Sequence, residues 1–392
     1  MGIQKILTRD FVLTFFAQFV SAGVFFILIP TIPIYLSNLG SSEGVIGVLV
    51  GVLSVASLVV RPFVGRALLK IPERTFMIAG SLLYIVSSIS YLFAEPFWPF
   101  LIVRILQGIG FALFATASLT LVTRISPEVH RGQSIGYFFL AINVAYALAP
   151  SLGMFIINRV NFTVLFLVCT GLSLGSLYIT LKLKKIQGGP LVDSPPQKQP
   201  FWSRAALPFS VMAFMGSIIW GAITAFFPLY AVKQGVTNPG FFFAAMAITL
   251  ILGRVFGGRI LDVCAKDKVI PPCLVAQIAA MTTLAFSTTY PMFILAAVIL
   301  GAGNAFFYPI LVAYAITLAG PSKGPAIGTY MALSDFGAGM GSVIMGIVIQ
   351  LTDYRTMFLS LACASLVNLS YFYFFVRKIE RRPREGDRYA NL

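Results

Sequence analysis

Apolar residues occur along this chain in long blocks that are separated by short polar breaks. A run of about 20 apolar residues is what an α-helix needs to cross the hydrocarbon core of a bilayer. The breaks carry turn-forming residues, such as the pair Glu95-Pro96. We therefore expect twelve transmembrane helices, at positions 11–36, 45–68, 75–93, 97–122, 135–157, 162–181, 206–232, 241–261, 269–286, 293–318, 327–351 and 357–376.

Composition agrees with a membrane protein and excludes a soluble domain. Hydrophobic residues make up 58% of the 392 positions, charged residues only 10%, and the mean hydropathy is +0.91. In a soluble domain about a quarter of the residues are charged. The first block, 11–36, is too long for the apolar region of a cleaved signal peptide, so we interpret it as the first span. The fold class that follows is an all-α membrane protein.

The basic residues that give the net charge of +15 gather in alternate loops. Loops on the side of the N-terminus carry most of them, whereas the opposite loops carry only Arg159, Lys233 and Arg355. Since cytoplasmic loops are enriched in lysine and arginine, we expect both termini in the cytoplasm and a multi-pass protein of a plasma membrane, with the bacterial inner membrane as the expected one. The basic tail could contact anionic membrane lipids.

Sequence patterns for catalysis or for metal binding are missing. No CxxC, HExxH or phosphate-binding glycine motif occurs, and the single histidine, His130, falls in a loop. Three of the four cysteines fall in predicted spans, where structural disulfides are not expected. We therefore expect no enzyme activity, no cofactor, no metal and no nucleic-acid partner.

One long polar stretch, 182–204, divides the twelve spans into six and six. It is rich in proline, glycine and lysine, as flexible linkers are. We predict an N-terminal six-helix bundle at 1–181, a cytoplasmic linker at 182–204, a C-terminal six-helix bundle at 205–378 and a basic cytoplasmic tail at 379–392.

The two halves repeat each other. The stretch that begins at Arg61, RPFVGRALLK, matches RVFGGRILDV from Arg254, 193 positions later. PIYLSNLG from Pro33 likewise matches PLYAVKQG from Pro228. Six spans separate the copies, so both halves have the same orientation in the membrane. Parallel repeats of this kind place a substrate site near the midplane between the halves, which opens to each side in turn.

These features resemble the major facilitator superfamily over the whole chain: twelve spans, a central loop and repeated halves. Its loop motif after the second span resembles the stretch that begins at Gly65, although Leu69 stands where the family has an acidic residue. The resemblance implies the fold of two pseudo-symmetric six-helix bundles and a gating role for these motifs. The residues implied are Arg61, Gly65, Arg66 and Arg74 in the first half and Arg254, Gly258, Arg259 and Asp262 in the second.

Two further motifs resemble those of the proton-coupled exporters in this family. The fourth span contains RILQGIG, with Arg104, Gln107 and Gly108, and the family links that arginine to proton coupling. The fifth span contains APSLG, with Pro150 and Gly153, which approximates a motif associated with antiporters. The resemblance therefore implies efflux driven by the proton gradient.

Asp335 is the one carboxylate that falls deep within a predicted span. It lies about eight residues inside, which corresponds to a depth of about 12 Å. An acidic residue there costs about 2.5–3.5 kcal/mol on insertion scales and usually faces a cavity or a partner. We predict that Asp335 is the proton-coupling group. The alternatives are a fixed ion pair, or the capping of a local helix break among the glycines that follow. For the glycines themselves we predict a packing role, because Gly337 and Gly341 form a small-xxx-small pattern that lets helices approach and slide.

The intramembrane arginines admit several interpretations. Arg104 could pair with Asp335 in one state, compensate a buried helix end or bind an anionic substrate. Arg61 and Arg254 occupy equivalent positions toward the cytoplasmic ends of their spans, which favours snorkelling or pairing at a gate. Counting 192 positions back from Asp335 reaches Asn143, so an amide and an acid occupy equivalent sites.

Polar and aromatic residues within the spans are candidates for the substrate cavity, because a polar group that faces lipid has no hydrogen-bond partner. They are Gln18, Tyr35, Gln107, Asn143, Tyr146, Trp220, Asn304, Tyr308, Tyr330 and Ser334. With 36 phenylalanines in the chain, we expect a largely apolar cavity for an amphipathic ligand.

The function favoured by the sequence is secondary active transport, with proton-coupled antiport and efflux of a small amphipathic organic molecule. The expected partners are this substrate, protons and membrane lipids, and the expected oligomeric state is a monomer. A proton-coupled importer, a uniporter, a lipid or lysolipid flippase and a sensor remain as alternatives, because the fold does not set the direction of transport.

Overall fold

The computed structural model describes residues 7–127, 130–184, 203–263, 266–318 and 323–377; the side chains of 131–132, 257–263, 266–267 and 323–325 lie outside the description. Within these ranges the chain forms twelve α-helices and a short π-helical turn. They are α2 (Arg9–Asn38), α3 (Glu43–Ala67), α4 (Glu73–Ser90), α5 (Trp98–Ile125), α6 (Arg131–Arg159), α7 (Phe162–Leu181), α8 (Leu207–Lys233), α9 (Gly240–Val263), α10 (Lys266–Phe286), α11 (Tyr290–Leu318), α12 (Lys323–Leu351), α13 (Tyr354–Tyr371) and η2 (Phe372–Val376).

Each predicted span coincides with one of these helices, and no predicted boundary is off by more than a few residues. Ten of the described helices are long and apolar enough to cross a membrane over their length. Helix α9 is apolar over a shorter stretch, Gly240–Phe256. Helix α4 begins with a glutamate and buries three serines, Ser81, Ser87 and Ser88, which lower its hydropathy. The prediction of an all-α, polytopic membrane protein is confirmed.

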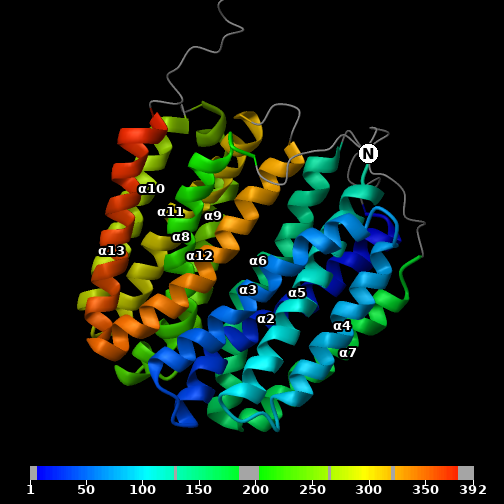
Figure 1. Ribbon diagram of the computed structural model, residues 1–392, viewed down its shortest axis with the longest axis horizontal. Helices are drawn as coiled ribbons and strands as arrows, with labels where there is room; N and C mark the ends of the chain where they lie inside the picture. The colour runs from blue at the N-terminus through cyan, green and yellow to red at the C-terminus, as the bar shows by residue number, and fades with distance from the viewer. Residues whose placement is uncertain (1–6, 128–129, 185–202, 264–265, 319–322, 378–392) are drawn as a thin grey trace, which may run out of the picture.

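The helices form two groups, α2–α7 and α8–η2, that lie side by side (Figure 1). We call the side on which α2 begins and η2 ends the terminal side, and the side of the α2–α3 turn the distal side. Contacts between the groups run mainly through two pairs of helices, α3 with α12 and α6 with α9. We call these pairs the first seam and the second seam. Helix α2 also contacts α8.

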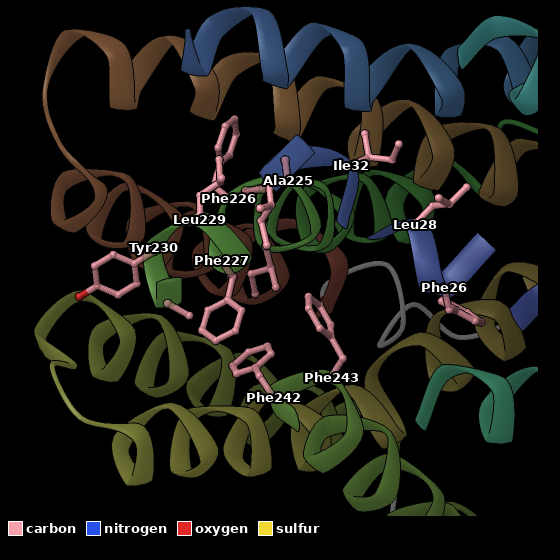
Figure 2. Packing of buried hydrophobic residues seen from close by; sticks show 14 of the residues in the cluster. Phe26, Leu28, Ile32, Ala225, Phe226, Phe227, Leu229, Tyr230, Phe242 and Phe243 are labelled. Atoms are coloured by element: carbon pink, nitrogen blue, oxygen red, sulfur yellow. The ribbon is translucent and has the colours of Figure 1, made fainter. Parts of the chain in front are cut away.

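Aromatic residues fill the core between the groups. Phe226 and Phe227 of α8 are fully buried, and the Phe227 ring stacks on that of Phe242 at 3.8 Å between centroids. Figure 2 shows these side chains together with Phe26, Leu28 and Ile32 of α2. Because van der Waals packing is one of the attractions that remain between helices in lipid, this cluster helps to hold the two halves together.

Helices α8 and α12 approach closely because of the glycines that follow Asp335. A Cβ added at Gly337 would collide with the Phe214 carbonyl oxygen, and one at Gly341 with that of Ile218. The expected role of these glycines in close helix packing is therefore confirmed. Helix α12 continues without interruption through this stretch, so Asp335 caps no local break.

Candidate functional site

The first seam is built on small residues that let two backbones touch. A Cβ added at Gly51 of α3 would lie 2.6 Å from the Gly339 carbonyl oxygen and 2.5 Å from Ser342 Oγ of α12. Gly47 likewise faces the carbonyl oxygen of Ser342. These contacts lie on the distal half of the molecule, where they leave no passage between α3 and α12.

The second seam uses an equivalent contact. A Cβ added at Gly240 of α9 would lie 2.6 Å from the Pro150 carbonyl carbon of α6. Gly240 follows Gly47 by 193 positions, and Ser342 follows Pro150 by 192. The structure therefore supports the repeat register that the sequence indicates. The same seam is joined further out by a 2.6 Å hydrogen bond that Asn158 Nδ2 donates to the carbonyl oxygen of Thr237.

Asp335 pairs with Arg61 across the first seam. Arg61 Nη1 lies 2.9 Å from Asp335 Oδ2, and each side chain is 23% exposed. The guanidinium also lies over the Phe111 ring of α5, at 5.4 Å, and beside the Met331 sulfur of α12 at 3.6 Å. The pair thus lies between the two halves rather than against lipid. One carboxylate and one guanidinium hold α12 to α3 about four turns along α3 from the Gly47 contact.

Arg104 does not contact Asp335. Its Nε donates to the Leu49 carbonyl oxygen at 2.8 Å and its Nη2 to that of Val50 at 3.1 Å, so it ties α5 to α3. Its Nη1 donates to Gln107 Oε1 at 2.7 Å, and the Tyr91 hydroxyl donates to the same oxygen at 2.6 Å. These carbonyl oxygens belong to the interior of α3, so in this structure Arg104 neither pairs with Asp335 nor compensates a helix end; it links the backbone of α3 to α5.

Two of the aromatic cavity candidates, Tyr146 and Trp220, lie near the second seam. The Tyr146 ring packs on Phe26 at 4.8 Å and edge-on against Trp220 at 5.5 Å. Trp220 and Arg104 line a small cavity of about 50 Å³ between the halves. Ligand pockets for organic molecules occupy about 300–1,000 Å³, so this cavity accommodates only a few water molecules.

The remaining candidates divide into packed and partly open residues. Gln18 is buried and accepts a hydrogen bond from Ser118 at 2.7 Å, and Tyr35 packs against the rings of Phe162 and Phe166. Asn304 Oδ1 accepts from Gln277 at 3.0 Å. Three further candidates lie on α11 and α12: the Tyr330 hydroxyl lies 3.4 Å from the Tyr308 carbonyl oxygen, and Ser334 is half-buried beside Asp335.

Asn143 and Arg254 contact neither each other nor any other polar partner. Asn143 of α6 is half-buried, Arg254 of α9 is exposed, and neither has a hydrogen bond or ion pair with the residues that the structure describes. This contrasts with Arg61, the equivalent of Arg254, which holds Asp335.

The motif residues near the terminal side are arranged differently from the family pattern. Arg74 Nη2 donates to the Leu181 carbonyl oxygen at 2.7 Å, and Arg66 lies in the last turn of α3. Gly65 borders open space, whereas Gly108 contacts the Leu53 carbonyl oxygen. Gly153 similarly brings α6 against α2. In the second half, the side chains of Gly258, Arg259 and Asp262 lie outside the described residues.

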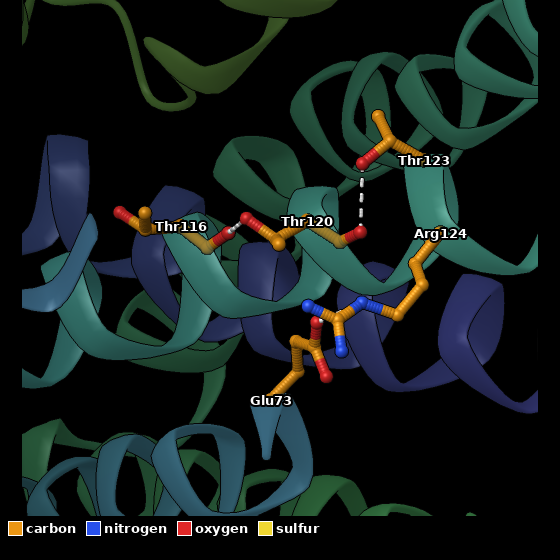
Figure 3. Close-up of polar contacts among 5 residues, drawn as sticks. All are labelled: Glu73, Thr116, Thr120, Thr123 and Arg124. Atoms are coloured by element: carbon orange, nitrogen blue, oxygen red, sulfur yellow. Dashed lines mark hydrogen bonds and ion pairs between the residues drawn. The ribbon is translucent and has the colours of Figure 1, made fainter. Parts of the chain in front are cut away.

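Sequence reasoning missed one buried ion pair. Glu73 Oε1 at the start of α4 lies 2.9 Å from Arg124 Nε at the end of α5, and Glu73 is only 1% exposed (Figure 3). The sequence signal for this ion pair was an acidic residue at the start of one helix, α4, and a basic residue at the end of the next, α5. These two helix ends lie on the same side, the terminal side. Glu73 stands four positions after Leu69, so this part of the chain does hold a carboxylate although the motif position does not.

Comparisons with known proteins identify the family. The profile of the Major Facilitator Superfamily matches residues 14–264 and 239–389. The staphylopine export protein of Staphylococcus aureus strain Mu50 is 24% identical over 371 residues, which cover 90% of this chain and 92% of that protein. The quinolone resistance protein NorA of Staphylococcus aureus strain MSSA476 is 22% identical, over 91% and 95% of the two chains.

Among solved structures, a mutant of the nucleoside transporter NupG superposes with a TM-score of 0.80. The superposition covers 94% of this chain and all of the transporter, at 14% sequence identity, and so supports the fold alone. Family profile, repeat register and fold agree, and the chain belongs to the Major Facilitator Superfamily.

Proposed function

We propose that this chain exports a small, partly apolar organic molecule in exchange for protons, with Asp335 as the group that binds the proton. The observation that carries the proposal is the contact between Asp335 and Arg61, which joins the two halves at 2.9 Å. Protonation of Asp335 removes the charge that attracts Arg61, so it weakens the connection between α3 and α12. A proton bound at this place therefore changes the balance between two arrangements of the halves.

The direction of transport rests on topology and on the relatives. If the terminal side is cytoplasmic, as the distribution of basic loops predicts, the glycine contacts close the outer side and substrate enters from the cytoplasm. Two relatives that match most of the chain are named as an export protein and a resistance protein. Both names favour efflux from the cell, across a bacterial plasma membrane and with the proton gradient as the only energy source. We propose a monomer, since each chain holds both halves.

The test is proton flux in proteoliposomes that contain a pH-sensitive dye. Lipophilic dye cations, sugars, organic acids and lysolipids are added in turn to the wild-type protein and to Asp335→Asn. We expect one class to release protons through the wild-type protein, and we expect Asp335→Asn to bind that class but to move no protons. Asp353→Asn, which changes an exposed carboxylate in the α12–α13 turn, is the matched control and should couple normally.

Any of three results would contradict the proposal. Normal coupling in Asp335→Asn would make Asp335 a structural residue. Substrate flux without proton movement in the wild-type protein would favour a uniporter, and lysolipid translocation would favour a flippase.

A further inference from the structure

The repeat places equivalents of the Arg61–Asp335 pair at the second seam. Arg254 of α9 lies 193 positions after Arg61, and Asn143 of α6 lies 192 positions before Asp335. The seam glycines and their partners show the same two offsets, so the equivalence holds in the structure as well as in the sequence. The guanidinium is therefore kept at the second seam, whereas the carboxylate is replaced by a neutral amide.

A second amide replaces the aromatic ring beside the guanidinium. Phe111, whose ring lies under Arg61, has Asn304 as its equivalent 193 positions later. Helices α9 and α11 touch at this level, because a Cβ added at Gly253 would lie 2.8 Å from Ala305 Cβ. Arg254 and Asn304 are the chain neighbours of these two contacting residues.

The amides are available as hydrogen-bond donors. Asn304 uses its oxygen to accept from Gln277 Nε2 at 3.0 Å, which leaves its Nδ2 hydrogens without an acceptor among the described residues. Asn143 is half-buried and has no hydrogen-bond partner in the described part of the chain. A guanidinium and two amides at the positions equivalent to Arg61, Asp335 and Phe111 supply N–H donors of the kind that suits a carboxylate.

Arg254 differs from the other two intramembrane arginines in having no partner in the described part of the chain. Arg61 pairs with Asp335, and Arg104 donates to two carbonyl oxygens and to Gln107 Oε1, whereas Arg254 has neither kind of partner among the residues whose side chains are described. Asp262, whose side chain is outside the description, stands eight positions along α9, or about 12 Å away. Uncompensated charge in a membrane is costly, and a bound anion removes that cost.

We infer that Arg254, with Asn143 and Asn304, forms a binding site for the carboxylate of the transported molecule. The substrate is then an organic acid or an amino acid derivative whose apolar part faces the aromatic residues near Tyr146 and Trp220. The inference rests on the proposed function, since it names the substrate class for the same path. It assigns the two charged seams different tasks: the first binds the proton and the second binds the substrate.

The experiment uses two probes that differ only in charge, N-dansylglycine and its neutral amide, N-dansylglycinamide. Their binding to the purified full-length protein in detergent micelles is followed by dansyl fluorescence at pH 7.5, with empty micelles as background. We expect the wild-type protein to bind the acid about tenfold more tightly than the amide, as one charge-assisted contact provides. Arg254→Gln should bind both probes equally, and Arg254→Lys should keep part of the preference.

Asn143→Asp is the sharpest variant. It recreates at the second seam the acid found at the first, so the new carboxylate should pair with Arg254 and exclude the acidic probe while the amide still binds. Retained binding of the amide shows that each variant is folded. Equal binding of the two probes to the wild-type protein, binding of neither probe at millimolar concentration, or an unchanged preference in Arg254→Gln would overturn the inference.

Two further measurements distinguish a lipid headgroup from a substrate carboxylate, and failure of the proposed function from failure of this inference. Displacement of the acidic probe by phosphatidylglycerol, but not by benzoate, would assign the site to a lipid headgroup and overturn the substrate assignment. Because binding in micelles requires no proton gradient, a retained preference together with absent proton flux would contradict the proposed function alone. Proton-coupled flux with no preference for the acid would contradict this inference alone.

Discussion

At the first seam a guanidinium meets a carboxylate, whereas at the second seam the equivalent guanidinium has no such partner among the described residues, and an amide stands at the position equivalent to the acid. The backbone contacts of the two seams are alike, since Gly47 and Gly240 occupy the same place in the repeat and both touch the facing helix. Duplication has therefore kept the close approach of the helices and has let the charges diverge. The two seams share their backbone contacts but differ in their charged residues. This difference allows one seam to respond to protons and the other to respond to substrate.

The largest effect on transport should come from a larger side chain at a glycine where the two helices of a seam touch. In Gly51→Leu the new side chain meets Ser342 and Gly339, and neither backbone has room to yield. We expect the distal side to be held open and transport to be lost. Spin labels at Ser41 and Thr352, in a cysteine-free chain, should move apart by about 2 Å or more, since helices that pack through larger side chains lie about 8–10 Å apart.

The matched control is Gly171→Leu on α7, where an added Cβ meets nothing within 4 Å. This variant should transport normally and leave the label distance unchanged. An unchanged distance in Gly51→Leu as well would show that the first seam is not closed by backbone contact.

The next effect concerns Arg104, which supports the first seam from α5. Its replacement in Arg104→Leu leaves the carbonyl oxygens of Leu49 and Val50, and Gln107 Oε1, without this donor. An unsatisfied buried acceptor costs about 1–3 kcal/mol, so we expect the free energy of unfolding to fall by about 3 kcal/mol or more. Denaturant titration in detergent micelles measures this change.

Removal of an arginine that makes no such contacts provides the control. Arg159→Leu, at the exposed end of α6, should change the free energy of unfolding by less than about 0.5 kcal/mol. If Arg104→Leu is equally mild, Arg104 does not hold α3, and its role lies with a ligand.

A smaller effect separates the two arginines of the repeat. Arg61→Gln leaves Asp335 without its cation and should cost about 1–2 kcal/mol, whereas Asp335→Asn in the same chain should recover part of that loss. Arg254→Gln should be neutral or slightly stabilising, because it removes a charge that has no partner in the described part of the chain. Equal losses for the two arginines in the same titration would contradict the charge difference between the seams.

Most of the fold could be predicted from sequence because lipid imposes simple rules. A spanning helix needs a fixed length of apolar residues, so the sequence predicts twelve helices to within a few positions. The predicted linker at 182–204 lies mostly outside the described residues, and the division into domains stays a prediction. The repeat register came from short matches around Arg61 and Arg254, and the contact of Gly240 with Pro150 agrees with it. Gly337 and Gly341 were predicted to pack closely for the same reason.

The contacts of the site were harder to predict, because they depend on how each helix is rotated about its axis. Asp335 stood out as an acid in a span, but whether Arg61 or Arg104 faced it required the structure. Periodicity within α5 does not show that Arg104 reaches carbonyl oxygens on α3. Glu73 precedes the predicted span at 75–93 by two positions, and its burial against Arg124 depends on the packing of two helix ends.

A second pair of equivalent positions, Asn161 and Asp353, also holds an amide in one half and an acid in the other. The smallest predicted effect, on the pH dependence of stability, comes from this pair. Asn161 caps α7 by accepting from the Val164 backbone N–H at 2.8 Å, and Asp353, 192 positions later, caps α13 by accepting from that of Thr356 at 2.7 Å. This hydrogen bond holds the pKa of the exposed Asp353 carboxyl below its usual value. Its stabilising contribution is therefore full above the usual pKa of aspartate, near 4, and is lost as the pH falls through the lower pKa of the folded state.

Asp353→Asn gives α13 the amide cap that α7 already has, which does not titrate. We expect the melting temperatures of the wild-type protein and the variant to be similar at pH 6 and to separate slightly, in favour of the variant, as the pH is lowered from about 5 to 3. Thermal unfolding in micelles across this range measures the separation, and all other carboxylates are common to both chains. Melting curves that shift in parallel at every pH would show that the cap on α13 contributes no more in its ionised form than in its neutral form.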